Sequence, residues 1–295
     1  MRGLESIPGV VQVVILRGSE CGPEVEPSLL VEVPHGADTQ AHYDAVATRL
    51  RSPLPDRLDR FFHVNTDVAA WAIGLTTAAH YIDQVPTAAA LALRCEIPRT
   101  FIDVNRVIGR RMTAGLTPGL QPWVTDPADV AWLTQMHERY TDRVGAAYER
   151  VCGAGGRALI PHTYAPRSVP ITQIDAHIIE ELDRVYQPEV LRQAPLRSEI
   201  DLITTTPEGV DLAPPGLAAA VTQRLSGFGY TVEHNHAYEL HPVTMGAKWS
   251  SQWPGSVLCL EVRRDLVTHW EPFVSKTLRS KAIDGIAQCI ALSLL

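Results

Sequence analysis

The sequence has few cysteines, and they form no metal-binding or redox motif. Of the 295 residues only 5 are cysteines, and no two of them are in a C-x-x-C arrangement. An odd number of widely separated cysteines argues against a disulfide framework and against a zinc site made of cysteines. It is typical of a protein in a reducing compartment.

The sequence also lacks an excess of positive charge and a long apolar run. The net charge is -7 and the isoelectric point is near 5.9, so we expect no nucleic-acid partner. No uncharged apolar run reaches about 18 residues, the length of a membrane-spanning helix. The first residues, MRGLESIPGV, lack the basic start and apolar core of a signal peptide. We therefore expect a cytoplasmic protein with no membrane partner and with a small molecule as its substrate.

The remaining composition is that of one globular domain. Hydrophobic residues make up 45% of the chain, enough for a large core. There is no internal repeat, no low-complexity tract and no segment with the composition of a linker. We expect a single domain over residues 1–295.

Short apolar runs alternate with longer helical patterns along the chain. β-branched runs bounded by glycine, proline or charge predict strands at 11–17, 28–33, 100–104, 157–162, 201–206, 230–235 and 256–262. Helical patterns lie at 40–51, 67–80, 127–152, 170–186, 215–226 and 271–294. The alternation predicts an α/β fold with a mixed, mostly parallel sheet and helices on both faces. Residues 109–125 and 186–200 are predicted to be long loops, which in compact domains are often functional.

The segment LLVEVPHGAD (29–38) carries an apolar strand into a histidine and an acid. Ligand sites in α/β sheets collect where strands end, so His35 and Asp38 are candidates for such a site. The pair alone has a second interpretation, in which Asp38 caps the helix that starts near Thr39 and His35 packs in the core.

Other predicted strands also bring ionisable groups to their ends. RALIPHTY delivers His162 next to a proline, and RTFIDVNR places Asp103, Asn105 and Arg106 where a strand closes. SVLCLEV contains Glu261 within an otherwise apolar strand, where an unpaired carboxylate costs several kcal/mol. Because several strand ends share this feature, we expect a common polar site.

These residue types suit one chemistry. Two histidines and a carboxylate are the ligands of a catalytic zinc that keeps a position for water, and a glutamate outside the ligand set can accept the proton of that zinc-bound water. An arginine nearby can hold a substrate carboxylate or stabilise an oxyanion. No G-x-S-x-G turn points to serine chemistry. The prediction is a metal-dependent hydrolase of an amide bond.

The order of the motifs resembles the N-formylglutamate amidohydrolases, which are related in fold to aspartoacylase and the zinc carboxypeptidases. The resemblance covers roughly residues 28–292, and its most specific part is the segment 99–106. The matching motifs are V-P-H-G (33–36), R-T-F-I-D-V-N-R (99–106), the strand ending in His162, N-H-A-Y (235–238) and C-L-E-V-R-R-D-L (259–266).

The resemblance implies a role for each matched position. His35 and His162 are the implied zinc ligands, and Glu261 is the implied general base. Arg99, Asn105 and Arg106 are implied to bind the substrate carboxylate or polarise its carbonyl. Asn235 and Tyr238 are also implied to bind the substrate. Asp103 is expected to orient Arg106 or a ligand histidine.

The third zinc ligand has two candidates. Spacing of the carboxypeptidase type, H-x-x-acid, favours Asp38, which is the preferred assignment. Members of the resembled family often carry the acid in a downstream T-D segment, here Thr66 and Asp67.

The chain also departs from the family pattern. Ile160 replaces an aspartate two residues before His162, and N-H-A-Y-E-L-H (235–241) stands where the family has N-x-P-Y-x-G-G. Larger side chains in this segment reshape the pocket wall, so the implied substrate is N-formylglutamate, a related N-acyl amino acid or a peptide end. The alternative prediction is an inactive family member that acts as a binding or interaction subunit.

Overall fold

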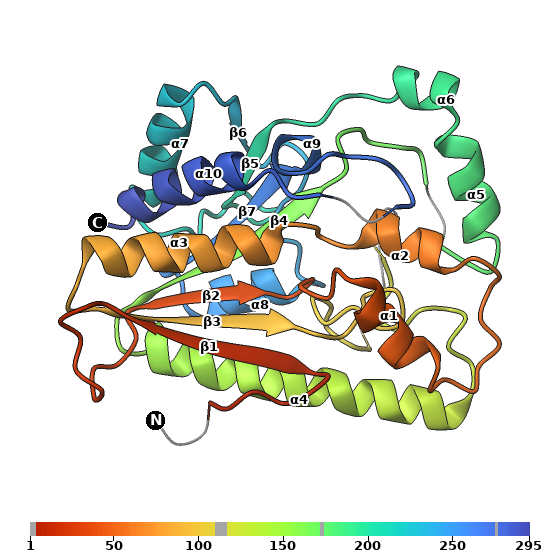
Figure 1. Cartoon of the computed structure of the whole chain (residues 1–295), viewed down its shortest axis with the longest axis horizontal. Coiled ribbons are helices and arrows are strands. Elements are labelled where there is room, and N and C mark those ends of the chain that lie inside the picture. Colours follow the sequence, from red (N-terminus) through yellow and green to blue (C-terminus); the bar gives the residue numbers. More distant parts are fainter. Residues whose placement is uncertain (1–3, 110–116, 172–173, 275–276) are drawn as a thin grey trace.

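The computed structural model describes residues 4–109, 117–171, 174–274 and 277–295 and is built around one mixed sheet (Figure 1). Its seven strands lie in the order β1-β3-β2-β4-β7-β5-β6. The central neighbours from β3 to β7 pair in parallel, whereas β1 on β3 and β5 on β7 are antiparallel. The strands are β1 (Val11–Arg17), β2 (Leu29–Val33), β3 (Ala89–Cys95), β4 (Arg157–Tyr164), β5 (Ile200–Ile203), β6 (Val232–His234) and β7 (Val257–Arg263).

Helices cover both faces of this sheet, as predicted. Leu29, Val31 and Val33 of β2 contribute to the core on the side of α3, α7 and α10, whereas Leu30 contributes to the core on the side of α4 and α8. A parallel sheet buried on both faces requires such apolar strands. The helices are α1 (Gln40–Ala47), α2 (Asp59–Asn65), α3 (Ala70–Gln84), α4 (Pro127–Val151), α5 (Ile178–Val185), α6 (Pro188–Gln193), α7 (Leu217–Gly227), α8 (Met245–Gln252), α9 (Arg264–Val267) and α10 (Ser280–Ser293).

One predicted strand is wrong and one strand was not predicted. Residues 100–104 form turns and a single isolated bridge, between Ile102 and Leu120, although Phe101, Ile102 and Val104 are buried in the core. The strand at this place in the chain is β3, with the sequence AALALRC. Its alanines lack the β-branched signal, but small side chains suit a strand that is covered by helices on both faces.

Several helix boundaries also differ from the prediction. The helix expected from 170 starts only at Ile178, and the helix expected from 271 starts only at Ser280. Positions 172–173 and 275–276 of those two expectations lie outside the described residues. The short helices α2, α6, α8 and α9 were not predicted, because segments this short carry little periodic signal.

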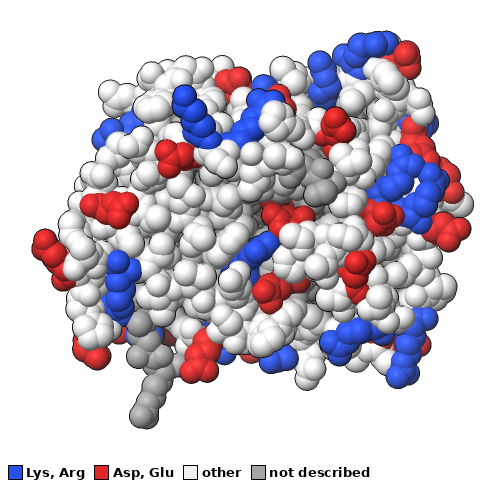
Figure 2. Space-filling model, in the orientation of Figure 1, with Lys and Arg blue, Asp and Glu red and all other residues white. Residues whose placement is uncertain are grey.

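The surface is a mixture of both charges on the face that Figure 2 shows, with acidic and basic side chains side by side over α5 and α6. Ion pairs such as Arg184 with Glu181 and Arg192 with Glu189 contribute to this mixture. Across the described parts of the chain, no helix combines the length and the apolar character needed to cross a membrane.

Candidate metal and substrate site

The candidate site lies where β2, β4 and β7 end at the same edge of the sheet. His35 follows β2 by two residues, and His162 on β4 pairs in register with Glu261 on β7. Asp67 belongs to the short connection between α2 and α3. Parallel strands direct their carboxyl ends to one side, so these four residues meet although the chain separates them widely.

Three of these side chains form a compact group of metal-binding type. Asp67 Oδ2 lies 3.2 Å from His35 Nδ1 and 2.9 Å from His162 Nδ1. One ligand atom from each residue lies within 4.8 Å of the others, and all three residues are buried. This group could hold a metal ion.

The contact of the other ring nitrogen of His35, Nε2, also supports a metal-binding site. This nitrogen lies 2.8 Å from Asp103 Oδ1, so an N–H at this position donates to the carboxylate. With that tautomer the lone pair of Nδ1 would be available to a metal ion. A carboxylate that orients a ligand imidazole in this way is usual around protein zinc sites. Two imidazole nitrogens, one carboxylate and this outer carboxylate fit a zinc ion.

The electrostatics of Asp67 are set by its histidine and arginine neighbours. Burial alone raises the pKa of a carboxyl, but His35 and His162 hold the pKa of Asp67 well below its usual range. Its other oxygen, Oδ1, lies 3.5 Å from Arg264 Nη2 and 3.6 Å from Arg99 Nη1. Asp67 is therefore ionised, as a metal ligand must be.

The preferred assignment of Asp38 as third ligand does not match this geometry. The carboxylate of Asp38 accepts a hydrogen bond of 2.6 Å from Arg94 Nη2, and Asp38 is not one of the residues that converge on His35 and His162. Asp38 does not cap α1 either, since Thr39 is the N-cap residue. Arg94 on the neighbouring strand β3 pairs with Asp38, so the H-x-x-acid spacing does not bring this acid to the two histidines. The alternative candidate, Asp67, is the acid that lies between the two histidines.

Glu261 lies beside these three residues, and one oxygen of its carboxylate has no hydrogen-bond partner among the described residues. This oxygen is Oε2, and the residue is 8% exposed. Burial raises the pKa of Glu261 to about 7, against the opposing effect of His162. A carboxylate with a raised pKa and a free oxygen is suited to accept and return a proton.

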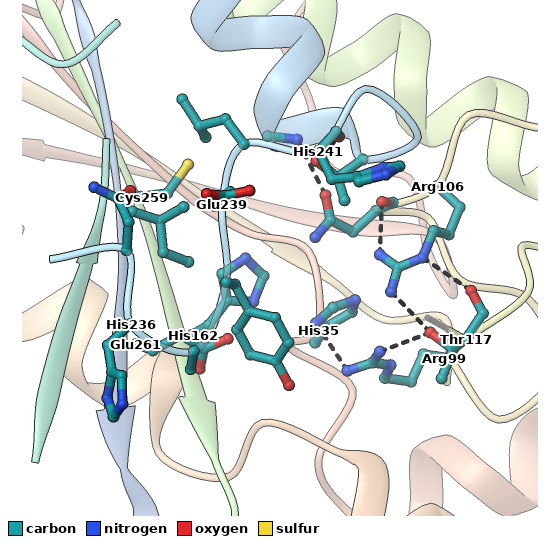
Figure 3. Close-up of a pocket in the computed structure, with 18 residues that line it drawn as sticks. His35, Arg99, Arg106, Thr117, His162, His236, Glu239, His241, Cys259 and Glu261 are labelled. Atoms are coloured by element: carbon teal, nitrogen blue, oxygen red, sulfur yellow. Dashed lines mark hydrogen bonds between the residues drawn. The ribbon is translucent and has the colours of Figure 1, made fainter. Parts of the chain in front are cut away.

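A cavity of about 470 Å³ opens in front of these residues (Figure 3). His35, His162, Glu261, Arg99 and Arg106 all line it. Much of the remaining wall comes from the segment 235–241, whose sequence NHAYELH departs from the resembled family.

The two predicted arginines are held in place by their neighbours. Arg99 Nη2 lies 3.1 Å from Asp103 Oδ2, and Arg106 Nη2 donates to Thr117 Oγ1 at 2.9 Å. Arg106 also donates to the carbonyl oxygens of Thr117 and Asn105. Asn105 itself accepts from the backbone of Gly246 through Oδ1, and none of the described residues accepts from its Nδ2. The guanidinium groups are therefore oriented by the protein.

The other two predicted substrate-binding residues, Asn235 and Tyr238, lie in the segment 235–241 of the cavity wall. Asn235 has a left-handed backbone (φ 53°), and its side-chain oxygen accepts from the backbone N–H groups of Thr204 and Thr205. It thus fixes the pocket wall. Tyr238 lines the cavity, and the guanidinium of Arg197 lies 5.7 Å from the centre of its ring.

Two contributors were missed by the sequence argument. Arg264 donates to the carbonyl oxygens of Val64 and Thr163, and its guanidinium lies 3.5 Å from Asp67. Thr117 accepts hydrogen bonds from Arg99 and Arg106 and donates one to Asp103. A usable signal existed for each residue. Arg264 lies in the same C-L-E-V-R-R-D-L motif as Glu261, and Thr117 lies in the predicted long loop 109–125.

Comparison with known proteins adds evidence on the fold. No protein-family model matches the chain, and no curated protein matches it in sequence. The crystal structure of N-formylglutamate amidohydrolase from Ralstonia eutropha JMP134 matches 97% of this chain and 96% of its own, with 18% identity and a TM-score of 0.56. A gene product of Agrobacterium tumefaciens matches 97% of this chain and 93% of its own, with 16% identity and a TM-score of 0.53. The chain is thus similar in fold to an N-formylglutamate amidohydrolase, which confirms the predicted resemblance at the level of the fold.

Proposed function

We propose that this protein is a zinc-dependent amidohydrolase that cleaves the amide bond of an N-acylated, carboxylate-bearing amino acid, as in N-formylglutamate, or of a peptide end. The observation that carries the proposal is the convergence of His35, Asp67 and His162 beside the unpaired carboxylate of Glu261 in one cavity. The fold shared with an N-formylglutamate amidohydrolase supports the same reaction class.

In this proposal His35, Asp67 and His162 hold the metal, and Asp103 and Arg264 position the ligand side chains. Zn²⁺ bound by three protein ligands lowers the pKa of water and polarises a carbonyl oxygen. Asp103 contacts Nε2 of His35 and so orients its ring, and Arg264, 3.5 Å from Asp67 Oδ1, orients that carboxylate between the two imidazoles.

Glu261 moves the proton. Its carboxylate lies next to His162 on the neighbouring strand and lines the cavity, so it can accept a proton from the attacking water. The water oxygen bonds to the amide carbon, the C–N bond breaks, and Glu261 returns the proton to the departing nitrogen. The products are the carboxylate of the acyl part and the free amine of the amino acid.

Arg99 and Arg106 bind the carboxylate of the substrate in this assignment. Asp103 and Thr117 hold their guanidinium groups in place, so these side chains lose less conformational entropy when the substrate binds. Asn105 Nδ2 adds a donor at the same wall, since its Oδ1 is already engaged by Gly246.

The test combines metal content with a substrate series. We expect about one zinc per chain by elemental analysis. Hydrolysis should be lost after chelation and return with added Zn²⁺. Three substrates, N-formyl-L-glutamate, its side-chain amide and its α-amide, are then compared by kcat/KM. Equal values would show that no carboxylate is recognised. If none of these three compounds and neither glycyl-L-glutamate nor propionyl-L-glutamate is hydrolysed, the alternative of an inactive binding subunit is supported.

A further inference from the structure

The segment 235–241 brings an unpaired carboxylate into the cavity. Glu239 lines the cavity and is exposed, and no described residue donates a hydrogen bond to its carboxylate or forms an ion pair with it. By contrast, Arg99 and Arg106 in the same cavity both lie beside Asp103. Glu239 is thus an ionic group of the cavity whose charge the protein leaves unmatched.

The backbone around Glu239 is fixed by several bonds. The N–H groups of His236 and Ala237 donate to the carboxylate of Asp201, at 3.1 and 2.7 Å. Leu240 N donates to Thr205 O at 2.8 Å, and His241 N donates to the carbonyl oxygen of Glu239 at 2.7 Å. Because the wall is anchored before and after Glu239, the backbone of this residue is held at the cavity by the fold.

Glu239 and the arginines line different parts of the same cavity. In Figure 3, Glu239 is drawn beside Cys259 at the left of the cavity, Arg99 and Arg106 are drawn at its right, and His35 is drawn near the centre. A substrate whose carboxylate reaches the arginines and whose amide carbonyl reaches the histidines therefore extends its acyl part toward Glu239. This arrangement matches a substrate with a negative charge on the part that supplies the amide nitrogen and a positive charge on the part that supplies the amide carbonyl.

We propose that Glu239 binds an ammonium group on the acyl part of the substrate. The substrate class is then an aminoacyl amino acid, that is, a dipeptide-like molecule with a free amino group at one end and a carboxylate at the other. This inference rests on the proposed function and narrows it. Hydrolysis adds one water across the amide bond and yields two amino acids, without an oxidant or a further reactant. A charge-assisted hydrogen bond in a partly enclosed cavity is stronger than a neutral one, so Glu239 discriminates against neutral acyl groups.

The experiment compares two substrates of nearly equal shape. Glycyl-L-glutamate carries an ammonium group where propionyl-L-glutamate carries a methyl group. With the zinc-loaded protein we expect kcat/KM to be about 10- to 100-fold higher for the glycyl compound, the usual effect of a hydrogen bond to a charged group. In Glu239→Gln this ratio should fall toward one, while the exposed Glu24→Gln, in the β1–β2 connection at the other end of the sheet, should keep the wild-type ratio.

The outcomes separate the two proposals. Hydrolysis of propionyl-L-glutamate as fast as glycyl-L-glutamate overturns the role of Glu239 and leaves the amidohydrolase proposal intact. A wild-type ratio in Glu239→Gln overturns it as well, because the preference then arises elsewhere. Absence of hydrolysis for these two compounds and for all three formyl substrates overturns the proposed function itself. Glu239→Lys, with malonyl-L-glutamate as the third substrate, should reverse the preference from the ammonium to the carboxylate acyl group.

Discussion

Two buried carboxylates near the sheet, Asp67 and Glu32, differ in what surrounds them. Asp67 is 3% exposed and lies between the imidazoles of His35 and His162. Glu32 is 1% exposed and accepts hydrogen bonds from the hydroxyls of Tyr140 and Tyr148, at 3.0 and 2.8 Å. The pKa of Asp67 lies well below its usual range, whereas burial raises the pKa of Glu32 to about 7 despite its two tyrosine donors.

The difference shows that burial does not by itself decide the charge of an acid in this protein. Desolvation raises the pKa of both groups, and only positively charged neighbours overcome it. The position in the fold supplies those neighbours. Asp67 lies at the strand ends, where loops bring histidines and arginines together, while Glu32 lies within β2 and faces the apolar side of α4. We therefore assign the first carboxylate to the site and the second to the internal structure of the fold.

The largest effect is expected from removing the carboxylate between the histidines. Asp67→Ala should leave the protein without bound zinc and without turnover, and His35→Ala and His162→Ala should do the same, because each takes away a ligand. Asp38→Ala should keep its zinc, since the Asp38 carboxylate pairs with Arg94. Elemental analysis after gel filtration measures the zinc content of each variant. Zinc lost from the Asp38 variant and kept by the Asp67 variant would restore the H-x-x-acid assignment.

Glu261 is a buried carboxylate in the candidate site, and burial raises its pKa to about 7, the same value as for Glu32 in the core. Glu261→Gln should keep the fold and the zinc while lowering kcat by roughly 10²- to 10⁴-fold, the usual contribution of a positioned proton acceptor. Steady-state kinetics and metal content are measured on the same preparation. Loss of zinc in this variant would make Glu261 a ligand, and unchanged kcat would remove it from the mechanism.

The raised pKa of Glu32 predicts a pH-dependent cost in stability. As pH rises from the usual carboxyl value of 4.5 to about 7, the unfolded chain loses the Glu32 proton before the folded protein does, so the free energy of unfolding falls over this window. The expected loss is about 3 kcal/mol. Glu32→Gln should remove that part of the pH dependence, as measured by urea unfolding from pH 4.5 to 7.5.

The difference between wild type and Glu32→Gln isolates this group from other acids with raised pKa, such as Glu261. Glu24→Gln on the exposed surface serves as control. A constant difference across the window would mean that Tyr140 and Tyr148 compensate fully for the burial of the Glu32 charge.

The smallest effect is expected from the arginines that border the site. Arg106→Lys keeps the charge but loses the planar group that donates to Thr117 and Asn105. We expect kcat/KM for N-formyl-L-glutamate to fall about tenfold, with a smaller effect on its α-amide or side-chain amide, whichever lacks the recognised carboxylate. An equal loss for all three substrates would assign Arg106 to holding Asp103 and Thr117 alone.

The sequence was sufficient for much of the fold because hydrophobic periodicity is local. It predicted six of the strands, all but β3, and the placement of helices on both faces. It failed for β3, whose alanines carry no strand signal, and for residues 100–104, which are apolar because they pack in the core rather than because they pair in the sheet.

The sequence by itself also identified three residues of the candidate site, since His35, His162 and Glu261 stand out as polar residues in or just after apolar strands. Only the tertiary structure decided which acid joins the histidines, because Arg94 lies on a different strand and pairs with Asp38, whereas Arg264 and Arg99 face Asp67. It likewise decided that Glu239 and the two arginines line the same cavity. Spacing along the chain specifies which residues can be neighbours on one element, but the charges that surround a buried carboxylate come from several elements and exist only when the sheet has formed.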